Sequence, residues 1–378
     1  MKKYRVFALL AALIALWIVV RGAASQTPEN PMYFPLVSYS HASPTPTLTP
    51  RPTRTPYPTP TPTLVPTQHP AYMYTTSYYM STINPATLYD MGCVQGQKHL
   101  QEAGRQDGMV VLDFGMPKYQ DGSYGASAFS IGFVTTAQLH AAVREFARGY
   151  WVCVGLDTLS HLTLGIGTSN YGQVWLRDGT NNYANAYNHG QAWAKLVAET
   201  AKWVEAQGYA GQVTVVGAND IELAWNTAAV TRRWVDGYAS AWEGKYPYFD
   251  FGDCNSCPSR TYPGWNSEAL GWSKSDIWYI AWGAAPAWPL PLVYSENGIN
   301  AQQWAYLSLY SNNTYSAPLW FNGPMTQHQS CIQNPDYCEG LDNEPLDGWL
   351  QLLYELGKFT VTRQDILPWE TDIKWWRP

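Results

Sequence analysis

The sequence predicts an α/β protein of the (β/α)8 TIM-barrel class, formed by a single domain that follows an exported N-terminal region. Short apolar runs recur after about residue 72, and most of them end in Gly, Asp, Asn or Glu. Patterns typical of helices lie between several of these runs, an alternation that favours a parallel sheet covered by helices. The region 72–378 contains no second linker, and its length of about 300 residues is typical of such a barrel.

Residues 1–25 have the pattern of a secretory leader. Lys2, Lys3 and Arg5 precede an apolar run over 7–20, and the small residues 22–25 follow it. The run is shorter than the about 20 residues that a membrane span needs, which favours a cleaved signal peptide. A retained signal anchor, tethering the protein to a membrane through residues 7–20, is the alternative. In both cases we expect the rest of the chain to be secreted or held at the cell surface.

Residues 26–71 are predicted to form a disordered linker. Between 43 and 70 the chain is a Pro/Thr tract, which forms neither helix nor sheet and extends as polyproline II. Such a tract is a spacer that holds the following domain away from a membrane or a wall.

Seven apolar runs are predicted to be strands of the barrel. They cover 109–115, 161–170, 212–222, 248–253, 276–283, 290–298 and 317–323. An eighth strand at 150–155 would be followed too soon by the run at 161, because a parallel crossover needs about a dozen residues. The number of strands is therefore left open.

Three helices have clear signals. Thr135 and Gln138 form a capping box before an apolar stripe, and Gly149 is expected to end that helix. A second stripe at helical spacing runs from Trp193 to Val204 and closes at Gly208. A third helix is expected to start at Asn343 as the cap, with Pro345 in its first turn. Its buried stripe would be Leu346, Leu350 and Leu353.

The six cysteines are even in number and belong to an exported chain, which favours disulfides over free thiols. Cys254 with Cys257 and Cys331 with Cys338 would close small loops, which leaves Cys93 for Cys153. A zinc site built from the two close pairs is the alternative. The C-x6-C spacing of the second pair is wide for a zinc knuckle.

Charge and motifs exclude several classes of function. The formal net charge of −6 falls to about −10 once the leader is removed, so nucleic acid is not an expected partner. The glycines of 165–172 do not have dinucleotide-binding spacing, and no Gly-x-Ser-x-Gly elbow is present. The histidines lack metal-ligand spacing. We therefore expect neither a cofactor nor a metal.

Two carboxylates, Asp220 and Glu222, stand at the end of the apolar run 212–222. In a barrel the chemistry lies at the carboxyl ends of the strands, and positions i and i+2 of a strand point to the same face. Crowded like charges raise the pKa of one carboxyl group, which then stays protonated as a general acid. The alternative is a pair of structural acids in a loop. Asp250 and Asp253 flank a glycine in another run, where a turn or substrate-rim role is expected.

These residues resemble the active-site segments of family 25 glycoside hydrolases, the Chalaropsis-type lysozymes. The resemblance covers the D-x-E of 220–222 and a strand ending in Asp113 that is followed by a YQ-G-like turn. It implies that Asp113, Asp220 and Glu222 surround a scissile bond of peptidoglycan, with Glu222 as proton donor. Phe114 and Gly115 depart from the Val-Ser of the family, and the lead into the D-x-E lacks its usual aromatic residues.

A second resemblance concerns Glu296. The run ending in Glu296-Asn297-Gly298 is similar to the nucleophile segment of retaining β-glycosidases, which would pair Glu296 as nucleophile with Glu222 as acid. The Asn-Glu-Pro acid motif of that clan occurs at 343–345, but it follows the nucleophile segment in the wrong chain order. We interpret it as the start of a helix.

Aromatic residues make up 15% of the chain, with 19 Trp and 27 Tyr, and flat rings with a polar edge suit stacking on sugars. Tyr119, Trp225, Trp282 and Trp320 are the candidates near predicted strand ends, with core packing as the alternative for each. The sequence thus predicts a muramidase-like glycosidase acting on peptidoglycan or another polysaccharide. A non-catalytic surface module that binds glycan is the competing hypothesis, because fold alone does not separate the two.

Overall fold

The computed structural model describes residues 73–171, 182–265 and 271–377, which belong to one compact unit. The expected leader, its apolar run 7–20 and the Pro/Thr-rich linker lie outside the described residues. Within the described part of the chain, no helix has the length and apolarity that crossing a membrane requires.

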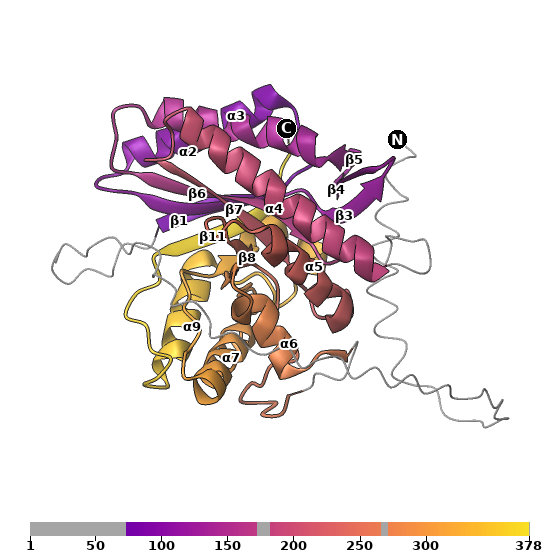
Figure 1. Ribbon diagram of the computed structural model, residues 1–378. Coiled ribbons are helices and arrows are strands. Elements are labelled where there is room, and N and C mark those ends of the chain that lie inside the picture. The colour runs from indigo at the N-terminus through magenta and orange to yellow at the C-terminus, as the bar shows by residue number, and fades with distance from the viewer. Residues whose placement is uncertain (1–72, 172–181, 266–270, 378) are drawn as a thin grey trace, which may run out of the picture. The chain divides into compact units, whose positions relative to one another are not determined.

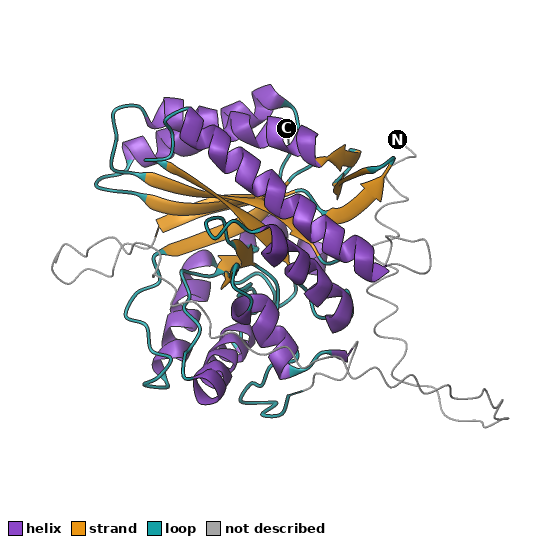
Figure 2. Cartoon of the chain, viewed as in Figure 1, coloured by secondary structure: helices purple, strands orange, loops and turns teal. Residues whose placement is uncertain are grey.

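Eight parallel strands form one strongly curled sheet, as the sequence predicts for a TIM-like α/β domain (Figures 1 and 2). Their order around the sheet is β10, β11, β1, β2, β6, β7, β8 and β9. A bridge between Leu292, just after β9, and Met325 in β10 joins the two edges. The strands are β1 (Met73–Tyr79), β2 (Asp107–Asp113), β6 (His161–Ser169), β7 (Val213–Asp220), β8 (Tyr248–Asp250), β9 (Ala287–Pro289), β10 (Met325–Thr326) and β11 (Trp369–Trp375).

Helices connect the successive strands, and a small antiparallel sheet is inserted after β2 (Figure 2). The small sheet consists of β3 (Met116–Gln120), β4 (Ser123–Ala128) and β5 (Gly132–Thr135). The larger helices are α2 (Pro85–Gln101), α3 (Thr136–Val154), α4 (Asn182–Ala206), α5 (Ala228–Ala241), α7 (Ile299–Tyr315) and α9 (Pro345–Gly357). The short ones are α6 (Lys274–Trp278), the π-helix η3 (Tyr279–Gly283), α8 (His328–Gln333) and the 3-10 helix η4 (Pro335–Tyr337).

Glycine contacts show which face of the central strands points into the barrel. A Cβ on Gly165 of β6 would meet the side chains of Met109, Val111 and Ala218 from the two neighbouring strands. A Cβ on Gly217 would instead meet Tyr238 of the outer helix α5. Because strand side chains alternate, Asp220 shares the inward face of Ala218. The end of β7 therefore presents this carboxyl group to the mouth of the barrel.

The predicted helix at Thr135 is correct in its start and wrong in its end. Thr135 and Gln138 form the expected capping box. The helix continues past Gly149 to Val154 and ends at Gly155, whose φ of 62° is left-handed. Gly149 serves packing instead, because a Cβ there would lie 2.0 Å from the carbonyl oxygen of Tyr89 in α2. The run at 150–155 is thus the last turn of α3 and not a strand.

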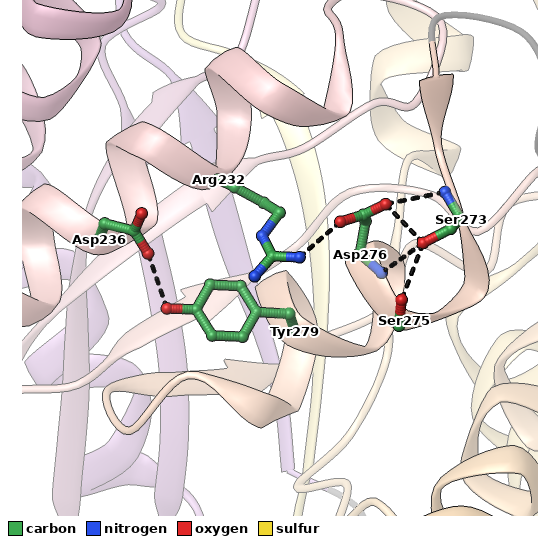
Figure 3. Close-up of polar contacts among 6 residues, drawn as sticks. All are labelled: Arg232, Asp236, Ser273, Ser275, Asp276 and Tyr279. Atoms are coloured by element: carbon green, nitrogen blue, oxygen red, sulfur yellow. Dashed lines mark hydrogen bonds and ion pairs between the residues drawn. The ribbon is translucent and has the colours of Figure 1, made fainter. Parts of the chain in front are cut away.

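The strand expected at 276–283 is wrong, because this segment forms α6 and η3. Ser273 and Asp276 make a capping box that starts the helix. Asp276 also accepts a hydrogen bond from Arg232 of α5 at 2.6 Å, and the Arg232 guanidinium lies 4.3 Å from the ring centre of Tyr279. The Tyr279 hydroxyl in turn donates to Asp236 at 2.7 Å (Figure 3). These contacts hold the segment as a helix against α5.

Two further strand positions are displaced. The strand expected at 290–298 lies earlier, as β9, and only Leu292 of the expected run takes part in a bridge. The run 317–323 forms no strand, and β10 follows it. Its backbone bonds to a side chain instead of a neighbouring strand: Phe321 N–H donates to Gln364 Oε1 at 2.9 Å, and Gln364 Nε2 donates to the Phe321 carbonyl at 2.7 Å.

The third predicted helix exists as α9, with Pro345 in its first turn as expected. Its expected buried stripe is wrong, because Leu346 and Leu350 are exposed and the buried face carries Trp349, Leu352 and Leu356. Asn343 is not its cap, because Glu344 occupies that position without a side-chain capping bond. The Asn343 side chain donates instead to the Val293 carbonyl at 3.2 Å. The 343–345 motif is therefore structural, as interpreted, although Asn343 ties the helix to the end of the β9 segment.

All six cysteines form disulfides, in the expected pairs Cys93–Cys153, Cys254–Cys257 and Cys331–Cys338. The alternative of a zinc site built from the two close pairs is wrong, because none of the six is a free thiol. Three disulfides indicate that the protein folds in an oxidising compartment.

The Cys93–Cys153 bridge joins α2 to α3 across 60 residues and should contribute strongly to stability. Replacing both cysteines by serine should lower the free energy of unfolding by about 4 kcal/mol, because the unfolded chain loses a long closed loop. Urea unfolding followed by circular dichroism measures this difference. An unchanged free energy of unfolding in the double variant would contradict the expectation.

Candidate active site

Acidic side chains gather at the carboxyl ends of neighbouring barrel strands. Asp113 is the last residue of β2 and Asp220 the last of β7. Strand β6 lies between them, with Asp113 beside Gly167 and Ser169 beside Asp220. Glu222 follows Asp220 by two residues. The structure therefore brings together the three carboxyl groups that the family 25 resemblance implies.

Asp113 is fixed by the turn that follows its strand. Its Oδ1 accepts a hydrogen bond from Gly115 N–H at 3.0 Å. Gly115 has a left-handed φ of 86°, and a Cβ there would lie 2.8 Å from the Ser127 carbonyl oxygen, so a glycine suits this position. The Gly115 carbonyl accepts from the Ser169 N–H at 3.1 Å, which ties the turn to β6.

The position of Asp113 departs from the family pattern in one respect. β1, which the sequence analysis missed, precedes β2, so Asp113 ends the second strand of the barrel and not the first. Tyr79 ends the first strand, directly beside Asp113 in the register.

Glu222 is held through its backbone by Asn170, just after β6. Asn170 Oδ1 accepts from the Glu222 N–H at 3.1 Å, and Asn170 Nδ2 donates to the Glu222 carbonyl at 3.0 Å. Asn226 fixes this clamp by donating to the Asn170 carbonyl at 3.0 Å. The Glu222 side chain is left free to face the acidic group, and part of its surface remains open to solvent.

Asp253 is a fourth member of the site, for which the sequence indicated only a turn or rim role. It is buried, its N–H donates to the Ile221 carbonyl at 3.2 Å, and its Oδ1 accepts from the Leu223 N–H at 3.1 Å. The preceding Gly252 makes this approach possible, because a Cβ there would lie 2.0 Å from the Ile221 oxygen. These contacts flank Glu222, and the charge of Asp253 raises the pKa of Glu222.

Asp250 is buried behind the site. Its neighbour Phe249 contacts Trp369 of β11 across the barrel, with ring centres 5.7 Å apart, so Asp250 points to the opposite face. Its Oδ1 accepts from the Gly252 N–H at 3.2 Å. Burial raises the pKa of Asp250 well above its usual range, and the side chain supports the turn that leads to Asp253.

Burial without a compensating cation raises the pKa values of these carboxyl groups. For Asp113, burial raises the pKa from 3.8 to about 7. For Asp220, burial and then the charges of Asp113, Asp253 and Asp250 raise the pKa well above its usual range. Asp220 Oδ1 has no hydrogen-bond partner, and no salt bridge within the described segments includes any of these acids. The neutral forms are therefore favoured.

The surroundings of Glu222 favour its protonated form. Burial, followed by the charges of Asp253 and Asp220, raises the Glu222 pKa well above its usual range. Burial also raises the pKa of Asp253. The two carboxyl groups therefore do not both ionise readily.

The charges of the acids act on the hydroxyl groups of two tyrosines. Burial raises the Tyr79 pKa, and Asp220, Asp113 and Glu222 raise it further. Burial and then Glu222, Asp253 and Asp220 raise the pKa of Tyr294, which follows β9. Both tyrosines remain neutral donors at physiological pH. Sequence analysis missed them, because β1 was not predicted and Tyr294 lay inside a run read as a strand.

The four aromatic residues proposed for sugar stacking lie in different places. Trp225 is exposed, its N–H donates to the Glu222 carbonyl at 3.1 Å, and its ring contacts Tyr171. Tyr119 is exposed on β3 and packs against Tyr124. Trp320 is exposed in the segment before β10. Trp282 is buried in η3 against Trp288, which favours the core-packing alternative for this residue. Trp225 is the one tied to Glu222 by a backbone bond.

A further aromatic cluster stands at the rim beside the acids and was not predicted. The Tyr79 ring lies 4.7 Å from that of Trp375 at the end of β11 and 5.6 Å from that of Phe129 in the turn between β4 and β5. All three side chains are half-buried. The inserted sheet therefore borders the acidic group on the β1 side.

Glu296 lies apart from the acidic group. Its side chain is exposed, and its pKa is raised by a hydrogen bond with Asp342, outside the site. The charges that act on Glu222 come instead from Asp253, Asp220 and Asp250.

No group of His, Cys, Asp and Glu side chains in the described ranges has the arrangement of a metal site. Comparison with protein-family models gives no match, and no curated protein matches the chain. The family 25 resemblance therefore rests on the residues quoted for it.

The raised pKa of Asp113 predicts a pH-dependent effect on stability. The folded protein binds the proton of the Asp113 carboxyl group more tightly than the unfolded chain does. The contribution of this group to the free energy of unfolding is therefore complete below about pH 4 and is lost as the pH rises to about 7. Asp113→Asn cannot ionise and should be equal to the wild type in stability at pH 4 but more stable at pH 8, by up to about 4 kcal/mol.

Chemical unfolding at pH 4, 6 and 8 tests this expectation, with Asp365→Asn at an exposed carboxyl group as the control. If the difference in free energy of unfolding between Asp113→Asn and the wild type does not grow with pH, ionising Asp113 in the folded protein does not lower its stability.

Proposed function

We propose that the protein is an exported glycoside hydrolase that cleaves peptidoglycan or another polysaccharide by carboxylate acid/base catalysis, in the manner of a muramidase. The observation that carries this proposal is the group of carboxyl side chains, Asp113, Asp220, Glu222 and Asp253, at the carboxyl ends of the parallel strands, where burial raises the pKa of Glu222. Glycoside hydrolysis needs one carboxyl group that keeps its proton and a second one that is ionised nearby.

In the proposed reaction Glu222 donates its proton to the glycosidic oxygen as the bond to the sugar breaks. Positive charge develops on the sugar ring in the transition state, and a carboxylate at the mouth stabilises it. Of the two further acids that the family 25 resemblance implies, Asp113 suits this role better than Asp220, because a pKa of about 7 leaves a share of it ionised at neutral pH. Asp113 then acts as nucleophile or activates the attacking water.

Burial of the acids favours the protonated Glu222 that this reaction needs. A proton on Glu222 at neutral pH follows from burial and from the neighbouring acids, since no counter-ion stabilises its ionised form. Proton donation leaves a carboxylate at Glu222, and the positive charge that develops on the sugar ring offsets this new negative charge. The half-buried cluster of Tyr79, Phe129 and Trp375 and the exposed Trp225 supply flat apolar faces that suit sugar rings.

The competing hypothesis is a non-catalytic glycan-binding module on the same scaffold. A neutral sugar can be bound by a few hydrogen-bonding groups and ring faces, so a binding module does not require several carboxyl groups whose joint burial lowers stability. A retaining β-glycosidase that uses Glu296 as nucleophile is disfavoured, because Glu296 is exposed and paired with Asp342.

An extracellular location agrees with the three disulfides and with the leader in the sequence. The Pro/Thr-rich linker would then separate the barrel from a membrane or wall, whether the leader is cleaved or is retained as a tether through residues 7–20.

Glu222→Gln should lower glycan cleavage by roughly two to four decades, the usual effect of removing a general acid. The amide keeps the shape of the side chain but has no proton to donate. The assay is turbidity loss of purified peptidoglycan, beside a panel of β-linked oligosaccharides. Glu296→Gln is the matched control and should retain the wild-type rate.

Folded wild-type protein that binds glycan and cleaves no substrate in either assay would favour the binding module. Loss of activity in Glu296→Gln equal to that in Glu222→Gln would instead revive the retaining β-glycosidase.

Trp225→Ala should weaken glycan binding about tenfold or more, because the bound sugar loses the exposed ring near Glu222 on which it stacks. Isothermal titration with an oligosaccharide, in the Glu222→Gln background to prevent turnover, measures the dissociation constant. Trp320→Ala, another exposed tryptophan, is the comparison. Equal affinities of the Trp225 variant and its parent would remove Trp225 from the site.

A further inference from the structure

The loop between α3 and β6, residues 155–160, presents two leucines to solvent. Leu156 is 97% exposed and Leu159 is 70% exposed, so neither side chain contributes to the core. Single exposed leucines are common on folded proteins. Two of them on one short loop form an apolar surface, which gains free energy when something covers it.

This loop belongs to the amino-terminal rim of the barrel. The Gln106 N–H, just before β2, donates to Ser160 Oγ at 2.9 Å. The Gln212 side chain, just before β7, donates to the Asp157 carbonyl. The loop therefore contacts residues that precede strands, whereas the acids of the mouth end strands or follow them. The two leucines and the acids lie at opposite ends of the barrel.

Hydrogen bonds fix the conformation of the loop. Asp157 Oδ1 accepts from the Leu159 N–H at 2.9 Å and from the Ser160 N–H at 3.0 Å. Gly155, with its left-handed φ, turns the chain at the end of α3. Because the backbone is already held, little conformational entropy is lost when the leucines bind another surface.

Further apolar side chains lie next to the loop. Leu100, at the end of α2, is exposed, and its Cδ2 would lie 3.9 Å from a Cβ on Gly155. Trp151, in the last turn of α3, is also exposed and stacks on Tyr209 with ring centres 4.4 Å apart. Leucine and tryptophan are side chains that suit the boundary between lipid head groups and acyl chains.

The described chain also enters the barrel on this rim. β1 begins at Met73, and Lys98 Nζ of α2 donates to the Tyr74 carbonyl at 2.8 Å. Leu100 follows Lys98 by two residues. If the apolar run 7–20 is retained as an anchor, it is joined through the linker to this end of the barrel. Such a tether raises the local concentration of the rim at a membrane, so that a weak apolar contact is sufficient for docking.

We propose that the amino-terminal rim docks on a lipid bilayer through Leu156 and Leu159. The stretch 149–160 contains one charged residue, Asp157, whose carboxylate binds N–H groups of the loop itself, so the contact is apolar. A fluid bilayer accepts protruding side chains of any shape, whereas a protein partner needs a hollow that matches both leucines. Docking turns the acidic mouth away from the membrane, and it does not depend on the proposed glycosidase function.

Co-sedimentation with phosphatidylcholine vesicles measures this docking. The protein is the chain without residues 1–25, the form that cleavage of the leader would leave, which contains every described residue and cannot bind through the leader. Changing both Leu156→Ser and Leu159→Ser should weaken vesicle binding about tenfold or more, because two apolar side chains no longer enter the lipid. Raising the salt concentration should leave wild-type binding unchanged, because the contact is apolar.

Ile332→Ser is the matched control. Ile332 is 65% exposed on α8, and the neighbouring Gln333 side chain bonds to the backbone of Trp375 at the end of β11, on the rim of the mouth. This variant should bind vesicles as the wild type does. Hydrogen exchange of the wild type gives a second measurement without any substitution. Vesicles should slow the exchange of backbone amides in 155–159 and leave that of 328–333 unchanged.

Equal vesicle binding by the wild type and the double leucine variant would overturn the proposal, as would exchange in 155–159 that vesicles do not slow. Sedimentation equilibrium without lipid tests a second copy of the chain as the occupant. A wild type that binds no vesicles and self-associates, beside a monomeric double variant, would replace the bilayer by a second copy. Cleavage of soluble oligosaccharides should be the same in the double variant and the wild type, so this proposal and the proposed function can fail separately.

Discussion

The mouth of this barrel is governed by the burial of several carboxyl groups with no cation to balance them. Parallel strands all end at the same rim, so acids placed at the ends of β2 and β7 and after β8 meet there. Separated from water, they do not all ionise at neutral pH, and the folded chain must keep protons on some of them. The raised pKa values of Glu222 and of the tyrosines around it follow from this constraint.

Close backbone contacts keep the acids in place despite their repulsion. Gly115 and Gly252 occupy positions where a side chain would collide with a neighbouring carbonyl, and Asn170 holds the peptide of Glu222 from both sides. Such an arrangement lowers stability, which agrees with the proposed catalytic role of the site. The apolar strands β2, β6 and β7 and the helices around them supply the compensating burial.

The apolar strands of the fold could be predicted from the sequence, whereas the strands that carry buried polar residues could not. The runs that became β2, β6 and β7 are buried and rich in aliphatic residues, and Asp113, Asp220 and Glu222 at their ends were found with them. β1 and β11 were missed because they carry Thr75, Ser77, Glu370 and Asp372, whose polar atoms bond within the fold. The sequence did not predict that Asp253 lies beside Glu222, because the segment after β8 contacts the end of β7 and no local pattern encodes that contact. The Ser273 and Asp276 capping box was the available signal against the strand at 276–283.

We infer that the folded protein holds protonated carboxyl groups at neutral pH, and that Glu222 is one of them. Infrared difference spectroscopy distinguishes the carbonyl band of a protonated carboxyl group from the bands of carboxylates, without reference to any substrate. At pH 7 the folded wild type should show the protonated band, which should weaken in Glu222→Gln and disappear on unfolding. A folded protein whose carboxyl groups are all ionised at pH 7 would contradict the account.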